Sequence, residues 1–484
     1  MISFIISLAA LVIGYLLYGK FVEKVFRPDP QRATPATTKS DGVDFIPLPS
    51  WKVFMIQFLN IAGTGPIFGA IMGAKFGPSA YLWIVLGCIF AGAVHDYLCG
   101  MLSVRHGGAG IPELVGSYLG GGAKKVMLVF SIVLLLLVGT VFVYSPAMIL
   151  GDIAGDGTSH SRMIWVLAIF AYYIAATLLP VDKVIGKLYP VFAIALLFMA
   201  AALAVCLFIK WPGIPEVWDG LGNRGPSIGL KDQPIFPCLF ITIACGAISG
   251  FHATQSPLMA RCITNEKLGR PVFYGAMITE GIVALIWAAV SSWFFFDGGA
   301  EAVGSDLSAA APTVVTKVSE NWLGIVGGIL AILGVVAAPI TSGDTAFRSA
   351  RLIVADFVKA PQKDIRKRLY IAIPLFIASG LLLWYNIADA NGFNVIWRYF
   401  GWANQTLAAF ALWTATAYFL KNGKRLSYLI SFIPAVFMTA VCVTFICVDK
   451  TGFRLPQAWI PWIASVTSAA SVVIFYLLKN KKKC

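Results

Sequence analysis

Long apolar runs recur along the whole chain, and they constrain its fold more than any other feature. A helix needs about 20 mainly apolar residues to cross a bilayer. Because the bilayer interior offers no water to backbone N–H and C=O groups, such runs are expected to be helical. The sequence therefore predicts an all-α integral membrane protein with about 13 transmembrane helices. Their predicted limits are 2–19, 53–73, 79–104, 126–150, 163–179, 189–209, 236–259, 272–296, 323–345, 369–386, 396–419, 427–449 and 459–478.

The distribution of charge supports a membrane protein and argues against a nucleic-acid partner. Only 12% of the residues are charged, whereas soluble domains carry about 25%. The formal net charge is +14, but the basic residues lie in short loops between apolar runs. Cytoplasmic loops carry an excess of Lys and Arg. With the N-terminus outside, 28 of the 37 Lys and Arg residues fall on the inside and 8 on the outside, and Arg398 lies in a helix. This bias predicts a cytoplasmic C-terminus in a plasma (cell inner) membrane.

Two of the predicted helices carry residues that should interrupt them within the membrane. The second contains Gly63-Thr64-Gly65-Pro66, and the seventh contains Gly246 and Gly250 with Pro257 behind. Proline removes a backbone donor, and glycine destabilises a helix by about 1 kcal/mol. Paired Gly/Pro interruptions in corresponding places point to a transporter site between inverted repeats. Close helix packing through small residues is the alternative.

The spacing of the two interruptions predicts the domain organisation. The first interrupted segment starts five segments before the second, so the two enter the membrane from opposite sides. We expect a 5+5 inverted repeat formed by residues 53–209 and 236–419. Residues 1–52 add an N-terminal helix and a cytoplasmic loop, and residues 420–484 add two peripheral helices.

Four short stretches resemble the carbon starvation protein A family, also called peptide transporter carbon starvation proteins. They are Ile61–Gly69, Gly92–Tyr97, Thr341–Thr345 and Phe400–Gln405. The resemblance implies transport of peptides or pyruvate during carbon limitation. It also implies a LeuT-type fold like that of the amino acid–polyamine–organocation transporters.

The candidate substrate site follows from the interruptions. Unwound backbone exposes N–H groups at half-helix starts, where the helix dipole also favours an anion. We therefore expect a small anionic nutrient to contact the first interruption, with side chains from the second and from the eleventh segment. The candidate substrate-binding residues are Asn60, Gly63, Thr64, Gly65, Ser249, His252 and Gln405.

Ionisable residues inside membrane segments are costly and usually functional. His95, Asp96, Glu280 and Asp344 are therefore candidates for ion coupling or gating. The alternative is local pairing with Arg261, Arg348 or Arg351, which would only hold helices together. Hydroxyls on the LeuT-type helix that corresponds to residues 323–345 imply a possible Na⁺ site at Thr341 and Ser342. The alternative for these hydroxyls is a bond back to their own helix.

These features, with the pyruvate or short peptides that the family resemblance implies as substrates, predict an ion-coupled importing symporter, with H⁺ or Na⁺ as the coupling ion and no other cofactor. Two other functions stay open. A channel has the same composition, and Ser249 with His252 resembles the motif of an intramembrane serine hydrolase. The cysteines show no metal-binding spacing and are interpreted as small buried apolar residues. No enzyme activity is expected.

Overall fold

The computed structural model describes residues 1–42, 44–153, 158–178, 181–230, 232–359, 365–389, 392–422 and 426–481. Within these ranges the protein is helical, and no strand occurs. The first half contains α1 (Ile2–Phe26), α2 (Pro35–Thr38), α3 (Ser50–Ala62), α4 (Ala70–Ala74), α5 (Ser79–Gly87), α6 (Ala93–Arg105), α7 (Ile111–Leu119), α8 (Gly121–Ile153), α9 (Ser159–Leu178) and α10 (Val181–Lys210).

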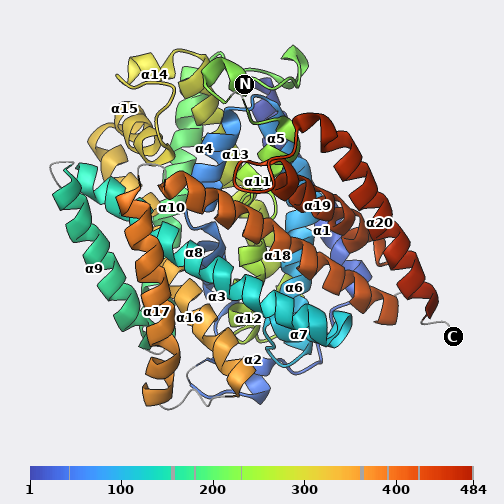
Figure 1. The fold of residues 1–484 in the computed structure, drawn as a ribbon. Coiled ribbons are helices and arrows are strands. Elements are labelled where there is room, and N and C mark those ends of the chain that lie inside the picture. The colour runs from blue at the N-terminus through green and yellow to red at the C-terminus, as the bar shows by residue number, and fades with distance from the viewer. Residues whose placement is uncertain are drawn as a thin grey trace.

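The second half is also helical (Figure 1). It contains α11 (Phe240–Thr242), α12 (Gly250–Ala260), α13 (Gly275–Phe296), α14 (Gly299–Ala302), α15 (Ala311–Ala331), α16 (Ala337–Val358), α17 (Ile365–Ala388), α18 (Gly392–Asn422), α19 (Leu429–Val448) and α20 (Ile460–Lys481). Wider π-helical turns join several of these helices, at Gly65–Gly69, Cys88–Gly92, Ile235–Leu239, Arg270–Tyr274 and Ile332–Val336. Such turns mark places where the regular helix is locally disturbed.

Part of the predicted set of membrane-spanning helices is confirmed. In the described ranges, eight helices are long and apolar enough to cross a bilayer, or nine if the bent pair Ser50–Ala62 and Gly65–Ala74 forms one span. A multi-pass membrane protein is therefore confirmed. The count of about 13 stays a prediction, although each predicted segment overlaps at least one helix.

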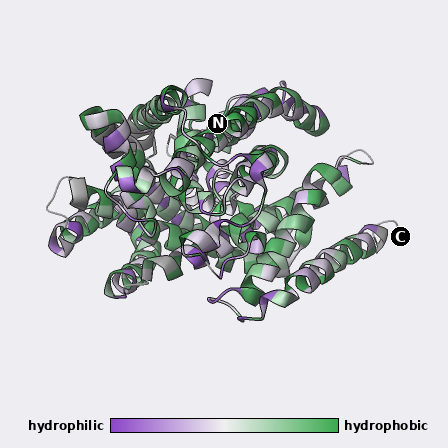
Figure 2. Ribbon diagram, turned by 90° about the horizontal axis from the view of Figure 1, so that it is seen from above, coloured by the Kyte–Doolittle hydropathy of each residue, from purple (hydrophilic) through white to green (hydrophobic). Residues whose placement is uncertain are grey.

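Burial separates central helices from peripheral ones. In the span Glu266–Phe296, 89% of the apolar stretch is buried, whereas in Gln457–Leu477 only 6% is buried. Helix α20 accordingly lies at the edge of the molecule, with α9 and α17 at the opposite side (Figure 1). Seen from above, hydrophobic residues occur on the outer helices as well as in the interior (Figure 2). Exposed side chains such as Leu381 and Trp462 suit contact with lipid rather than water.

Both predicted interruptions are present. Helix α3 ends at Ala62, Gly63 adopts φ 25°, and the chain resumes at Gly65 after a bend of 51°. In the second segment, α11 ends at Thr242 and α12 begins at Gly250. Gly246 lies between them with φ 90°, a conformation that side chains with a Cβ rarely adopt. The prediction of two discontinuous helices is confirmed.

Several predicted boundaries were wrong. Helix α10 begins at Val181, eight residues before the predicted start at 189. The predicted segment 323–345 ends before Arg348, but α16 continues to Val358 with Arg348 and Arg351 both buried. Protein, not lipid, surrounds these arginines, so their charge does not end the helix. Likewise α1 continues seven residues beyond Gly19, to Phe26.

Candidate functional site

The two broken helices touch at their interruptions. A Cβ atom placed on Gly65 would lie 2.3 Å from the Cβ and Sγ atoms of Cys245. A Cβ on Gly69 would lie 2.9 Å from the Thr242 carbonyl oxygen, at the end of α11. Only glycine lets the two chains approach this closely, so the breaks form one continuous region of unwound backbone.

Polar side chains without partners surround the first break. Asn60 and Thr64 are fully buried. Among the described residues, neither the Asn60 amide nor the Thr64 hydroxyl has a hydrogen-bond partner. A buried polar group left unpaired costs about 1–3 kcal/mol. These groups could therefore bind a molecule. The substrate-binding role of Asn60, Gly63, Thr64 and Gly65 stays a prediction.

Helix α18 holds both sides of the second break. Asn404 Oδ1 accepts the backbone N–H of Phe251 at 2.6 Å and the hydroxyl of Ser249 at 3.1 Å. The neighbouring Gln405 donates from Nε2 to the Phe240 carbonyl at 2.8 Å. Gln405 thus binds the first half-helix and Asn404 the second. The predicted residue Gln405 contacts the break through its amide nitrogen, and its Oε1 is left without a partner in the described structure.

Four buried ionisable residues form one chain across three helices. His95 Nδ1 lies 2.8 Å from Asp96 Oδ1, and His252 Nδ1 lies 2.9 Å from Asp96 Oδ2. On the other side of the ring, His252 Nε2 lies 3.4 Å from Glu280 Oε2. The chain joins α6 and α13 to α12 at the second break. Asp96 and Glu280 therefore face His252, and the predicted alternative partner Arg261 instead donates to the Gly108 carbonyl.

Residues of α16 face the first break from another side. The Ser342 hydroxyl donates to the Leu59 carbonyl at 2.9 Å, which links α16 to the last turn of α3. The Thr341 hydroxyl bonds back to Ala337 and Ala338 in its own helix. Of the predicted Na⁺ pair, only Ser342 points its oxygen at the broken helix.

Asp344 is fully buried next to Tyr189 of α10. Its Oδ2 accepts from the Tyr189 hydroxyl at 3.3 Å, and the same hydroxyl donates to the Thr341 carbonyl at 2.8 Å. Within the described ranges, no ion pair within 4.0 Å joins Asp344 to Arg348, and Arg348 donates to the Ala176 carbonyl. The second carboxylate oxygen of Asp344 has no hydrogen-bond partner there.

The sequence did not single out Cys245, Asn404 or Tyr189 as site residues. Asn404 precedes Gln405 directly, so its place in the same motif was the available signal. Cys245 lies at the start of the second interruption but was interpreted as an apolar filler. Its Sγ atom, a His252 ring nitrogen and a Glu280 oxygen all lie within 4.8 Å of one another, which makes them a set able to hold a metal ion.

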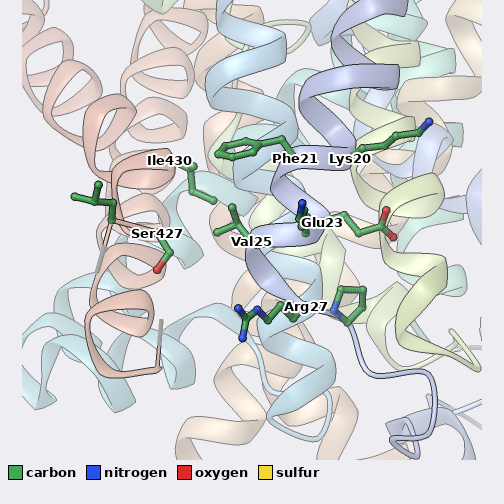
Figure 3. A pocket seen from close by; sticks show the side chains of 10 residues that line it. Lys20, Phe21, Glu23, Val25, Arg27, Ser427 and Ile430 are labelled. Carbon is green, nitrogen blue, oxygen red and sulfur yellow. The ribbon is translucent and has the colours of Figure 1, made fainter. Parts of the chain in front are cut away.

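One large surface pocket lies away from the broken helices. A pocket of about 690 Å³ lies between α1 and the start of α19, and it is lined by Lys20, Phe21, Glu23, Lys24, Val25, Arg27, Pro28, Leu426, Ser427 and Ile430 (Figure 3). None of the predicted site residues lines it. A smaller pocket of about 350 Å³ does reach Ile241 and Thr242 of α11, and Lys75 and Arg398 also line it.

Comparison with known proteins gives the family. The model of the family described as "Carbon starvation protein CstA" matches residues 1–150, 148–325 and 298–445. An uncharacterized membrane protein of Haemophilus influenzae is 48% identical over 61% of this chain and 91% of its own length. The peptide transporter CstA of Campylobacter jejuni is 28% identical over 88% of this chain and 77% of its own. The pyruvate/proton symporter BtsT of Escherichia coli K12 is 24% identical, over 93% and 81%.

A likeness among solved structures concerns the fold alone. A mutant of the Eremococcus coleocola manganese transporter superposes with a TM-score of 0.57 at 11% identity, covering 92% of this chain and 99% of that chain.

The family match agrees with the four stretches identified in the sequence, one of which contains the first break. Because the family model matches nearly the whole chain, this protein belongs to the carbon starvation protein CstA family.

Proposed function

We propose that this protein is a secondary transporter that carries a small anionic nutrient, pyruvate or short peptides, across the cytoplasmic membrane. The observation that carries the proposal is the contact between two broken helices at Gly65 and Cys245, surrounded by unpaired buried polar groups. Non-helical backbone at membrane depth is tolerated where it is buried in protein or lines a cavity. Relatives named as a peptide transporter and as a pyruvate/proton symporter support the proposal.

The chemistry of the breaks suits a carboxylate. Helix α12 begins at Gly250 inside the protein, so the positive end of its dipole points into the break. Asn60 and Thr64 offer side-chain donors from the first break. The pocket that reaches α11 is lined by Lys75 and Arg398, and Lys75 supplies a positive charge to an arriving anion. Arg398 pairs with Asp449 at 2.6 Å and so holds one wall of that pocket.

We further propose that residues 53–209 and 236–419 are the two halves of a LeuT-type inverted repeat. Each half starts with an interrupted helix, and the two interruptions touch. The N-terminus would then lie outside and the C-terminus in the cytoplasm, in line with the distribution of Lys and Arg.

Coupling to an ion is assigned to α16. Asp344 is a buried carboxylate with one unpaired oxygen, and Ser342 on the same helix contacts the carbonyl of Leu59 at the first break. Binding of a cation or proton at Asp344 would therefore affect the position of α3, which ends at the proposed substrate site, through the contact of Ser342 with Leu59. The chain of His95, Asp96, His252 and Glu280 serves as a gate element, because it ties α12 to α6 and α13.

The hydrolase alternative fits the geometry poorly. A serine nucleophile needs a base within hydrogen-bond distance of its hydroxyl. The Ser249 hydroxyl faces Asn404 and Cys245, while the His252 ring lies between Asp96 and Glu280. The relatives with named activities are transporters, which agrees with the prediction that the protein is not an enzyme.

Uptake into proteoliposomes tests the proposal. We would measure labelled pyruvate and a labelled dipeptide, with H⁺ and Na⁺ gradients imposed separately. Gradient-driven accumulation of one substrate is expected, and the gradient that drives it identifies the ion. Absence of uptake for both substrates under both gradients would reject the proposal. Currents far above transporter turnover would favour the channel instead.

A further inference from the structure

Three side chains of types that bind metals lie close together next to the contact of the two breaks. Cys245 lies in the unwound segment, His252 on α12 and Glu280 on α13, and all three are buried. One ligand atom from each lies within 4.8 Å of the others. Around a tetrahedral ion with bonds of ~2.0–2.3 Å, ligand atoms lie ~3.5 Å apart. Side-chain rotations that move the ligand atoms by about 1 Å would therefore bring all three within bonding distance of one ion.

The surroundings of His252 prepare one nitrogen for a metal. Asp96 Oδ2 lies 2.9 Å from Nδ1, and His95 holds the other oxygen of Asp96 at 2.8 Å. Metal-bound histidines commonly give their second ring N–H to a carboxylate, which fixes the tautomer and orients the ring. With the proton on Nδ1, the lone pair of Nε2 points toward Glu280 and Cys245.

The atoms that face this point lack hydrogen-bond partners. Among the described residues, His252 Nε2 and both Glu280 oxygens have no hydrogen bond of normal geometry, although all are fully buried. The Glu280 carboxylate approaches the Gly246 N–H and stands 3.4 Å from Nε2, which is an ion-pair distance. The Cys245 thiol makes a weak contact with Ser249 Oγ, at 3.4 Å.

We propose that Cys245, His252 and Glu280 form a binding site for a transition-metal ion of the zinc class. Thiolate and imidazole ligands select Zn²⁺ and its analogue Co²⁺ over Ca²⁺ and Mg²⁺, which prefer oxygen. Three protein ligands leave the fourth position of the ion open to water or to another ligand. Binding converts the Cys245 thiol to a thiolate, and its proton is released to solvent. The site rests on this geometry alone and does not depend on the proposed transport function.

The test uses the purified full-length protein in detergent after removal of metal with EDTA. Co²⁺ is titrated while the thiolate-to-cobalt charge-transfer absorption is recorded, and bound Zn²⁺ is counted by elemental analysis after dialysis. We expect one ion per chain and a charge-transfer band. Cys245→Ser keeps a side chain of similar size, and it should abolish the band and weaken Zn²⁺ binding at least ~10-fold. Glu280→Gln should weaken binding while keeping the band.

The matched control is Cys262→Ser. Cys262 is also buried, and its thiol contacts backbone groups of Leu258, at 3.5 Å, and of Ile46. This variant should bind metal as the parent does. Equal binding by the parent, Cys245→Ser and Glu280→Gln would overturn the proposal, and so would absence of bound metal in a folded parent. Thermal unfolding of each metal-free variant establishes that it is folded, and Asp96→Asn provides a second variant that weakens binding without removing a ligand.

Discussion

The Asn404 side chain of α18 accepts the backbone N–H of Phe251, at 2.6 Å, in the first turn of α12. The N-cap residue of α12 is Ser249, whose own hydroxyl caps nothing and instead donates to Asn404. A residue more than 150 positions away therefore supplies the cap that the local sequence lacks. This relation explains how α12 can begin inside the protein with the N–H of Phe251 paired.

Asn404→Ala should lower the free energy of unfolding by about 1–3 kcal/mol, since it removes a cap and leaves a buried N–H unpaired. Unfolding of the purified protein in detergent measures this loss. Thr414→Val is the control, because the buried Thr414 hydroxyl bonds only within its own helix, to Phe410. Equal losses in both variants would contradict the capping role.

Gly65→Ala should destabilise the contact of the two breaks and reduce uptake. The added Cβ would lie 2.3 Å from Cys245, and overpacking of this kind costs about 1–3 kcal/mol. Adding Cys245→Gly removes the obstructing atoms, so the double variant should recover much of the lost stability. Unfolding is measured with EDTA present, which excludes any contribution from metal.

Gly110→Ala serves as the control for that series. A Cβ at Gly110 meets only the Pro112 side chain, at 3.8 Å, and φ is −70°. The variant should therefore be as stable as the parent. If Cys245→Gly gave no recovery to Gly65→Ala, steric contact between the breaks would not be the cause of the loss.

Asp344→Asn should uncouple accumulation from the ion gradient while keeping substrate exchange. It preserves size and the contact with Tyr189 but removes the buried charge that would hold a proton or cation. Gradient-driven uptake and equilibrium exchange are compared on the same purified variant. Full accumulation by Asp344→Asn would show that the carboxylate is only structural. Glu301→Gln, at an exposed position on α14, is the matched loss of charge and should change neither measurement.

Acid should loosen the attachment of α1 through Glu216. The Glu216 carboxylate accepts the backbone N–H groups of Ile2 at 2.9 Å and Ser3 at 2.7 Å, and it pairs with the Met1 amino group. Burial by itself raises the pKa of Glu216, but these hydrogen bonds outweigh it and lower the pKa below its usual value. A lowered pKa stabilises the fold above the unfolded-state pKa, and this stabilisation is lost as pH falls through the folded-state pKa.

The measurement is thermal unfolding from neutral pH down to a pH below the usual glutamate pKa of 4.5. Glu216→Gln should be less stable than the parent at neutral pH, and the difference should shrink as the pH falls toward the acidic end. Glu301→Gln, a carboxylate exposed on α14, is the control and should follow the parent at each pH. A constant difference between parent and Glu216→Gln would contradict the role of the charge.

Local chemistry made the membrane class and the two breaks predictable. An apolar run needs no distant partner to favour lipid, and Gly63, Gly65 and Pro66 disturb a helix wherever they occur. The rarity of ionisable residues in apolar segments also identified His95, Asp96, Glu280 and Asp344 as residues with special surroundings. The identification of the family used the same stretches.

Tertiary structure decided which of these residues meet. Asp96 faces His252 from 156 positions away, and no local pattern distinguishes that partner from the arginines that follow each segment. The end of α16 was misjudged for a related reason, because hydropathy treats Arg348 as facing lipid or water, whereas packed helices bury it. Local sequence fixes where a helix is weak, since backbone preferences act over a few residues. Which side chains fill the gap depends on helix packing, because the burial and hydrogen bonds that stabilise it come from segments far apart in the chain.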